Sequence, residues 1–390
     1  MIELLASIAR IITSLPPAVI VVGFAALIIT LMGTTYQYAV VQVGLYVTSL
    51  SIFSVGAASD NAVRVVALLL AVLRIMSRGG VDPGNIFVVL GVWRRPVTAF
   101  LAMSILSVVW SIHRGDSIVA LIGFGILLVV ILSLSDNYPV VLRATRSVVL
   151  ASVALSVPYA ASPSAWFRGR LHGIFENANT LGVFALMAAI LLYSGWKPRQ
   201  IPLYLTILVI IIATGSRASG VGAVFGTIAY LVSLRRSEIR RTSLSVLILF
   251  AGLVASLFYF ASPNSSEILR VKDTRTGVWQ SALDMAEGRW LQGVGSGAIG
   301  LEAGSSMLRI LVELGVIGAA ILLFLIVSRV IRSPKAPWQS AMLAALLGNS
   351  SFEAWLFTGG SAIFLVFILL TRIPDQTRVS RPAPAVLTVG

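Results

Sequence analysis

Long apolar runs recur from one end of this 390-residue sequence to the other, and they limit what the chain can fold into. The length of each run is close to the about 20 residues that a helix needs to cross the hydrocarbon core of a bilayer. Only helices and closed barrels can span lipid, because backbone polar groups find no water there. The runs are rich in Leu, Val, Ile and Ala without polar alternation, so they predict transmembrane helices.

Composition supports the membrane class. The chain is 57% hydrophobic and 11% charged, whereas soluble domains are about 45–50% apolar and about 25% charged. The net charge of +14 would suggest nucleic acid in a soluble protein, but here it reflects Lys and Arg that flank transmembrane helices. The absence of cysteine excludes disulfides, thiol catalysis and cysteine metal ligands.

The expected fold class is therefore all-α, a polytopic bundle of about twelve or thirteen transmembrane helices within residues 1–372. Segment 2–15 is either interfacial or a further short span, so the side of the N-terminus stays open. Residues 373–390 are rich in Pro and polar side chains and predict a disordered cytoplasmic tail. The expected spans lie near 17–33, 37–56, 61–77, 96–112, 117–135, 143–160, 178–194, 199–214, 219–234, 243–261, 306–328, 339–350 and 356–372.

Basic residues mark every second loop from residue 94 onward, which predicts the orientation in the membrane. By the positive-inside bias these loops face the cytoplasm. The two longest loops, 159–177 and 262–305, then lie on the outer face. The basic residues on the cytoplasmic side are Arg94, Arg95, Arg143, Arg146, Lys197, Arg199, Arg235, Arg236, Arg240, Arg241, Arg329, Arg332 and Lys335.

Both outer loops carry cations where the bias disfavours them. Neighbouring carboxylates or lipid headgroups could pair with single arginines, but for the set we favour an anionic ligand, because the planar guanidinium suits phosphate. The outer cations are Arg168, Arg170, Arg270, Lys272, Arg275 and Arg289, with Arg217 at the outer end of another span.

Five segments between about residues 96 and 330 resemble, in order, motifs of the O-antigen polymerase and ligase superfamily of bacterial polysaccharide assembly. The segments are SILSVVWSIHRGDS (104–117), RLHGIFENANTLG (170–182), ATGSRASGVGAVFG (213–226), TRTGVWQSAL with LQGVGSG (274–283 and 291–297), and GSSMLRILVELGVIG (304–318). The resemblance implies a GT-C-like fold in the cytoplasmic membrane of a bacterium, with its active face outward. It also implies glycosyl transfer from a polyprenyl-pyrophosphate-linked saccharide to a hydroxyl of a saccharide or lipid-linked acceptor.

One departure bears on the branch of the superfamily. The closing motif of the ligases opens with a histidine, whereas this sequence has Gly304 and Ser305 there. This favours a polymerase over a ligase-like transferase to a lipid acceptor. A transporter or flippase of a lipid-linked or anionic solute, and a non-catalytic partner in envelope assembly, remain as alternatives. A transporter predicts internal repeats and broken helices near the midplane, and the sequence shows no convincing repeat.

The site follows from the charge of the leaving pyrophosphate. No Asp-x-Asp or histidine cluster lies in the outer loops, so we expect a metal-independent enzyme without cofactor, in which guanidinium groups stabilise that charge. Arg217 and Arg275 are the expected catalytic cations, and Glu302, beside the vacant histidine position, is the expected base; Glu176, Asp273 and His172 are alternatives. The expected substrate-binding residues are Arg168, Arg170, Arg270, Arg289, His172, Asn179 and Trp279.

Other residues indicate structural roles. Arg309 and Glu313 lie four apart on one helix and predict an ion pair that holds the preceding loop to the bundle. Glycines 220, 222 and 226 predict close helix packing. Asn177 and Asn179 are expected to cap the span that follows them. The expected partners are the lipid-linked donor, the acceptor, membrane lipids and envelope-assembly proteins, and no nucleic acid.

Overall fold

The computed structural model describes residues 17–48, 57–80, 90, 93–134, 137–193, 201–233, 274–299, 304–332, 336–358 and 361–371. The expected span 243–261, segment 2–15 and the tail 373–390 lie outside these residues.

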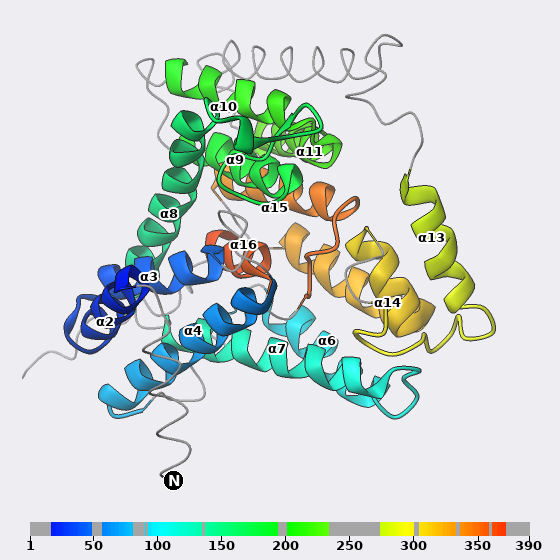
Figure 1. The fold of residues 1–390 in the computed structure, drawn as a ribbon. Coiled ribbons are helices and arrows are strands. Elements are labelled where there is room, and N and C mark those ends of the chain that lie inside the picture. Colours follow the sequence, from blue (N-terminus) through cyan, green and yellow to red (C-terminus); the bar gives the residue numbers. More distant parts are fainter. Residues whose placement is uncertain are drawn as a thin grey trace, which may run out of the picture.

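The described chain is mostly helical (Figure 1). A helix lies at every expected span within the described residues, which confirms the helical class. These helices are α2 (Pro17–Met32), α3 (Thr35–Thr48), α4 (Ala57–Ser77), α6 (Arg94–Ser107), α7 (Arg114–Ser133), α8 (Tyr138–Tyr159), α9 (Ala178–Tyr193), α10 (Ile201–Thr214), α11 (Arg217–Ser233), α14 (Ser306–Arg332), α15 (Pro337–Ser350) and α16 (Ala362–Thr371).

Within the described residues, three helices are long and apolar enough to cross a membrane, namely α7, α8 and the Ser306–Ser328 part of α14. Large apolar side chains stay exposed on all three of them, such as Val119 (67%) on α7, Leu155 (58%) on α8 and Phe324 (68%) on α14. Water would oppose such a surface, whereas hydrocarbon accepts it. The chain is therefore a membrane protein, and membrane crossing by the shorter helices remains a prediction.

The interior is built around α9 and α16, whose side chains are almost all buried. A helix that is apolar on every side has to be enclosed by others. Helices α8, α10, α11 and α15 pack around α9 (Figure 1). Aromatic rings fill the space between α6, α7 and α16, where Phe100 stacks on Phe357 with centroids 4.9 Å apart and Trp93 lies 4.7 Å from Phe367.

Helices α11 and α15 approach closely at two of the three glycines for which the sequence predicts close packing, Gly222 and Gly226. A Cβ atom on Gly222 would lie 2.5 Å from the carbonyl oxygen of Ala345, and one on Gly226 would lie 2.9 Å from the Ala345 Cβ. These contacts leave no room for a side chain, so small residues set the distance between the two backbones.

The expected outer loop 159–177 contains a β-hairpin that the sequence does not predict. Strand β1 (Trp166–Phe167) pairs antiparallel with β2 (Arg170–Leu171). The two residues between them, Arg168 and Gly169, have φ of 51° and 70°. Two-residue hairpin loops require such positive φ values, and the Arg-Gly pair was the available sequence signal.

A further difference is α13 (Thr274–Met285), a helix inside the expected outer loop 262–305. It packs on the segment 293–299 and on α14 through small apolar side chains, among them Ala282, Ala286 and Val312. The loop is therefore folded against the membrane helices over its described residues.

Helix α14 is broken at Gly315, which has φ 69° and ψ 179°. The break frees backbone carbonyl groups of α14, and amides of the glycine-rich segment 293–299 donate to them. The amides of Val294 and Gly295 donate to the carbonyls of Val312 (2.9 Å) and Glu313 (3.0 Å). The amide of Val316 donates to the carbonyl of Trp290 (2.8 Å). Irregular backbone at membrane depth is tolerated where protein satisfies it.

The helix ends that the charge bias assigns to the cytoplasm meet one another. Arg74 donates to the carbonyls of Thr30 (2.6 Å) and Gly33 (3.1 Å). The guanidinium of Arg146 lies 4.5 Å from the centre of the Trp338 ring. Further links at this end join Tyr36 to Ser147 and Trp93 to Thr371.

Candidate functional site

The loops expected on the outer face also converge, at the opposite ends of these helices. The loop before α7 contacts the glycine-rich segment, because the Ile112 amide donates to the carbonyl of Val294 (3.0 Å). The Ser296 amide donates to the Ser107 hydroxyl (2.9 Å). The start of α14 contacts the loop after α15, since the Ser306 hydroxyl donates to the carbonyl of Glu353 (2.6 Å). Loops far apart in the sequence thus form one surface.

Arg170 on β2 connects three of these segments. Its Nε donates to the carbonyl of Thr214 at the end of α10 (2.8 Å), and its Nη2 donates to Oδ1 of Asn179 on α9 (2.6 Å). A Cβ on Gly215 would lie 3.3 Å from the Arg170 Nε. Gly215, at φ 57°, therefore lets the chain turn from α10 into α11 directly against the guanidinium.

Two helix N-termini flank this guanidinium. Helix α9 starts after Asn177, whose side-chain oxygen accepts from the Asn179 amide (2.8 Å), so the expected cap is confirmed for Asn177. Helix α11 starts after Ser216, whose hydroxyl accepts from the Ser219 amide (3.3 Å). The positive ends of two helix dipoles and the Arg170 cation are thus close together, an arrangement that favours an anion.

Glu353 belongs to the same site and is absent from the sequence-based candidates. Its Oε1 accepts from Nδ2 of Asn179 (2.8 Å), so Asn179 bridges the guanidinium of Arg170 and this carboxylate. The available signal was its position, since it is an acidic residue in the short connection between two expected spans. A carboxylate between two membrane spans is costly when it has no partner.

The remaining sequence candidates are distributed unevenly. Arg217 is exposed on the first turn of α11, next to the Arg170 site. Arg168 is exposed at the hairpin tip, 5.1 Å from the centre of the Phe167 ring. His172 Nδ1 contacts the carbonyl of Phe175.

The structure describes part of the second expected outer loop, 262–305. Trp279 is half-buried on α13, and its indole N–H is buried without a hydrogen-bond partner. Arg289 is exposed after α13. Arg275 lies on α13, but its side chain is not among the described parts of the structure. Arg270 and Glu302 lie outside the described residues. The structure thus joins Arg170 with Asn179 and leaves Arg168 and Arg289 apart at the surface.

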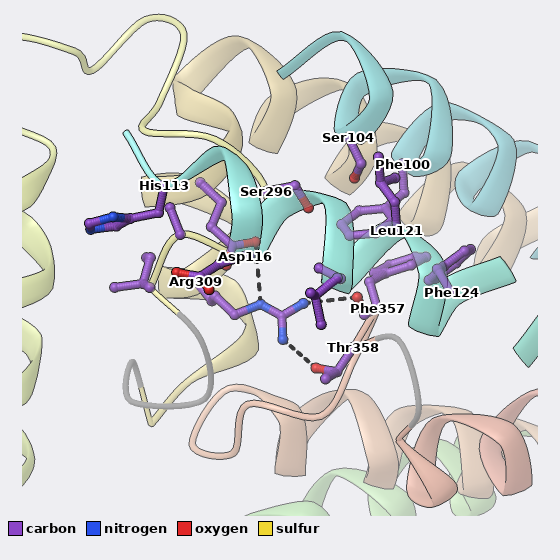
Figure 2. Close-up of a pocket in the computed structure, with 16 residues that line it drawn as sticks. Phe100, Ser104, His113, Asp116, Leu121, Phe124, Ser296, Arg309, Phe357 and Thr358 are labelled. Atoms are coloured by element: carbon purple, nitrogen blue, oxygen red, sulfur yellow. Dashed lines mark hydrogen bonds and ion pairs between the residues drawn. The ribbon is translucent and has the colours of Figure 1, made fainter. Parts of the chain in front are cut away.

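A cavity of about 500 Å³ lies beside this surface, between α6, α7, the glycine-rich segment and α14 (Figure 2). None of the expected site residues that the structure describes lines it. Its polar lining comes from Ser104, His113, Asp116, Ser296, Arg309, Glu313 and Thr358, and its aromatic lining from Phe100, Phe124 and Phe357.

The expected ion pair of Arg309 and Glu313 lies in the wall of this cavity. Arg309 Nε is 3.6 Å from Glu313 Oε2, and the two side chains are 5% and 1% exposed. Arg309 also donates to the Thr358 hydroxyl and to the carbonyl of Phe357 (2.8 Å) (Figure 2). The expected ion pair is therefore present, but Arg309 ties α14 to the loop after α15, whereas the sequence predicts a tie to the loop that precedes α14.

In the described part of the chain, no group of three or more His, Cys, Asp or Glu side chains gathers as a metal site would require. Comparisons with protein families, curated proteins and solved structures found no match to this chain. The site therefore has to be interpreted from its own chemistry.

Proposed function

We propose that the chain is an integral membrane glycosyltransferase that uses a polyprenyl-pyrophosphate-linked saccharide at the outer face of the cytoplasmic membrane. The reaction class is that of a polysaccharide or O-antigen-type polymerase. One observation carries the proposal: Arg170 is fixed between the N-termini of α9 and α11, and Arg217 occupies the first turn of α11. The motif resemblance and the convergence of the outer loops support it.

The chemistry fits this positive site. In the transfer, the bond between the anomeric carbon and the pyrophosphate oxygen breaks, and its electron pair leaves with the pyrophosphate. An acceptor hydroxyl oxygen bonds to the same carbon, and its proton passes to a base. Negative charge grows on the leaving group, where preorganised guanidinium groups and helix N-termini would stabilise it.

Two carboxylates are candidates for the base. Glu302 is the base that the sequence predicts. Glu353 is a second carboxylate for it, because its hydrogen bond from Asn179 places it one side chain from the Arg170 guanidinium. A carboxylate so placed would lie near the bond that forms when pyrophosphate occupies the arginine site.

One observation favours a transporter as the second candidate. Broken helices carry substrate and ion sites in many transporters, and α14 is broken at Gly315. However, the carbonyls of Val312 and Glu313 at this break accept amides of the glycine-rich segment. They are therefore used within the protein, which weakens the transporter interpretation.

The test is a reaction in a defined bilayer. Purified protein in nanodiscs would receive a fluorescent polyprenyl-pyrophosphate-linked oligosaccharide, with a chelator and without nucleotide sugar. A polymerase yields a ladder of products, whereas a ligase-like enzyme yields a single transfer when an acceptor lipid is added. Absence of any product from folded protein, together with movement of the donor across liposome membranes, would reject the enzyme in favour of the transporter.

A further inference from the structure

The cavity between α6, α7 and α14 contains buried polar atoms that form no hydrogen bond with the part of the chain that the structure describes. These atoms are the Ser104 hydroxyl and both carboxylate oxygens of Glu313, although each residue is about 1% exposed and Glu313 is ion-paired with Arg309. The backbone amides of Gly297 and Ile299 also face the Glu313 carboxylate. Buried polar groups of this kind are rare in folded proteins, and each calls for a ligand or water.

The charges of the lining define which ligand fits. Asp116 and Glu313 would repel an anion such as a diphosphate, while Arg309 beside Glu313 opposes a cation. A neutral ligand avoids both repulsions. Carboxylate oxygens accept hydrogen bonds, and serine hydroxyls donate or accept them, so the matching ligand carries several hydroxyl groups.

The rest of the lining is aromatic. Phe100, Phe124 and Phe357 form an apolar side of the cavity, with Ser104 beside Phe100, while His113 and Asp116 lie at the other side (Figure 2). Hydroxyl groups project from the rim of a sugar ring, whereas its C–H face is apolar, so this two-sided lining matches a pyranose. A volume of about 500 Å³ lies in the range of small-ligand sites, which is about 300–1,000 Å³.

We propose that this cavity binds a saccharide group, with the Ser104 hydroxyl and the Glu313 carboxylate as hydrogen-bond partners and Phe100 and Phe124 as the wall behind its ring. The proposal rests on the proposed function in one respect, namely that it makes this saccharide the acceptor. Saccharide binding itself does not depend on transfer.

The segment 353–358 connects the cavity with the arginine site. Glu353 at its start contacts Asn179, and Thr358 at its end contacts Arg309 in the cavity wall. The cavity also reaches the lipid-facing surface of α7, because Val119 lines it and is 67% exposed. A saccharide could therefore arrive free from the outer side or as the headgroup of a lipid.

The experiment measures saccharide binding without any donor. Saturation-transfer NMR would be recorded on the protein in nanodiscs with methyl glycosides of glucose, galactose and N-acetylglucosamine, and separately with their octyl glycosides below micelle formation. Signal from the octyl glycosides alone assigns a lipid-linked source, and signal from both series admits a free saccharide.

Variants locate the binding site. Val119→Trp at the mouth of the cavity should abolish the signal. Ser104→Ala should weaken binding about fivefold through loss of one hydrogen bond, and it should leave folding intact because the hydroxyl has no protein partner. Leu106→Trp, on an exposed α6 position outside the cavity lining, is the matched control and should bind as the unchanged chain does.

The proposal is overturned if neither series of glycosides gives signal, or if Val119→Trp and Ser104→Ala bind as well as the unchanged chain. Binding that depends on the cavity in a protein without transferase activity would reject the proposed function and retain the saccharide site. The two failures can therefore be told apart.

Discussion

At the scale of single residues, Arg170 shows why a guanidinium and not an ammonium stands at the site. Its Nε and Nη2 point to different partners, the carbonyl of Thr214 and the side chain of Asn179. A lysine provides a single point charge on a flexible stem and cannot hold both segments in one geometry. The charge and the geometry of Arg170 can therefore be separated by substitution.

Arg170→Lys keeps the charge and removes the two-sided contact. We expect turnover of the lipid-linked donor to fall by about tenfold or more, since misplacement of a catalytic group by even about 1 Å is costly. Initial rates in nanodiscs would measure it. Asn179→Asp as a companion variant keeps an acceptor for Arg170 but loses the donor to Glu353; turnover like that of the unchanged chain in both variants would contradict the assignment.

Arg217→Ala and Arg275→Ala should each abolish product while the protein still inserts. Removing one preorganised donor to a developing negative charge costs about 100-fold or more in turnover. Arg114→Ala, an exposed arginine at the same end of the molecule, is the control and should leave turnover unchanged. Activity retained in both site variants would remove these arginines from the mechanism.

At the scale of elements, the position of the helices could be predicted and their interruptions could not. A run of about 20 apolar residues requires a helix in lipid wherever the rest of the chain goes. The break at Gly315 depends instead on amides that residues 290–295 bring to it, and the hairpin at 166–171 depends on its turn. These features arise from contacts that hydropathy does not record.

The residues of the candidate site could likewise be predicted only in part. Arg170, Asn179 and Arg217 stood out because polar residues at the ends of apolar runs are conspicuous. Glu353 and the cavity around Ser104 did not, because their neighbours come from segments distant in the sequence. A search for every acidic residue close to a span would have found Glu353.

Gly222 provides a test of element packing. Gly222→Ala should destabilise the protein by about 1–3 kcal/mol, because the added methyl would lie 2.5 Å from the carbonyl oxygen of Ala345. Gly125→Ala on α7 is the matched control, since a methyl there meets nothing within 4 Å. It should be neutral or stabilising by about 0.5–1 kcal/mol. Thermal unfolding in one detergent compares the two, and equal midpoints would contradict the packing described.

At the scale of the whole molecule, contacts sort the helix ends into the two groups that the basic residues predict. Arg146 and Trp338 meet at one end, while Arg170, Asn179 and Glu353 meet at the other. The charge bias was read from the sequence without reference to these contacts. Their agreement supports the alternating topology and leaves its direction in the membrane to experiment.

The direction can be measured cleanly because the chain contains no cysteine. Ser164→Cys near the hairpin and Ser77→Cys at the end of α4 both place a thiol at an exposed position. A maleimide that cannot cross membranes should label Ser164→Cys in intact spheroplasts and Ser77→Cys only after lysis. The reverse pattern would place the arginine site in the cytoplasm and exclude a reaction at the outer face.

The broken helix α14 also has a consequence for how the protein is made. If α14 left the insertion machinery alone, it would present the bare carbonyls of Val312 and Glu313 to the lipid. The residues that cover them, 290–295, precede α14 in the chain and are therefore synthesised earlier. Biogenesis should therefore join the two before α14 is released, so that an uncovered α14 would be a target for membrane quality control.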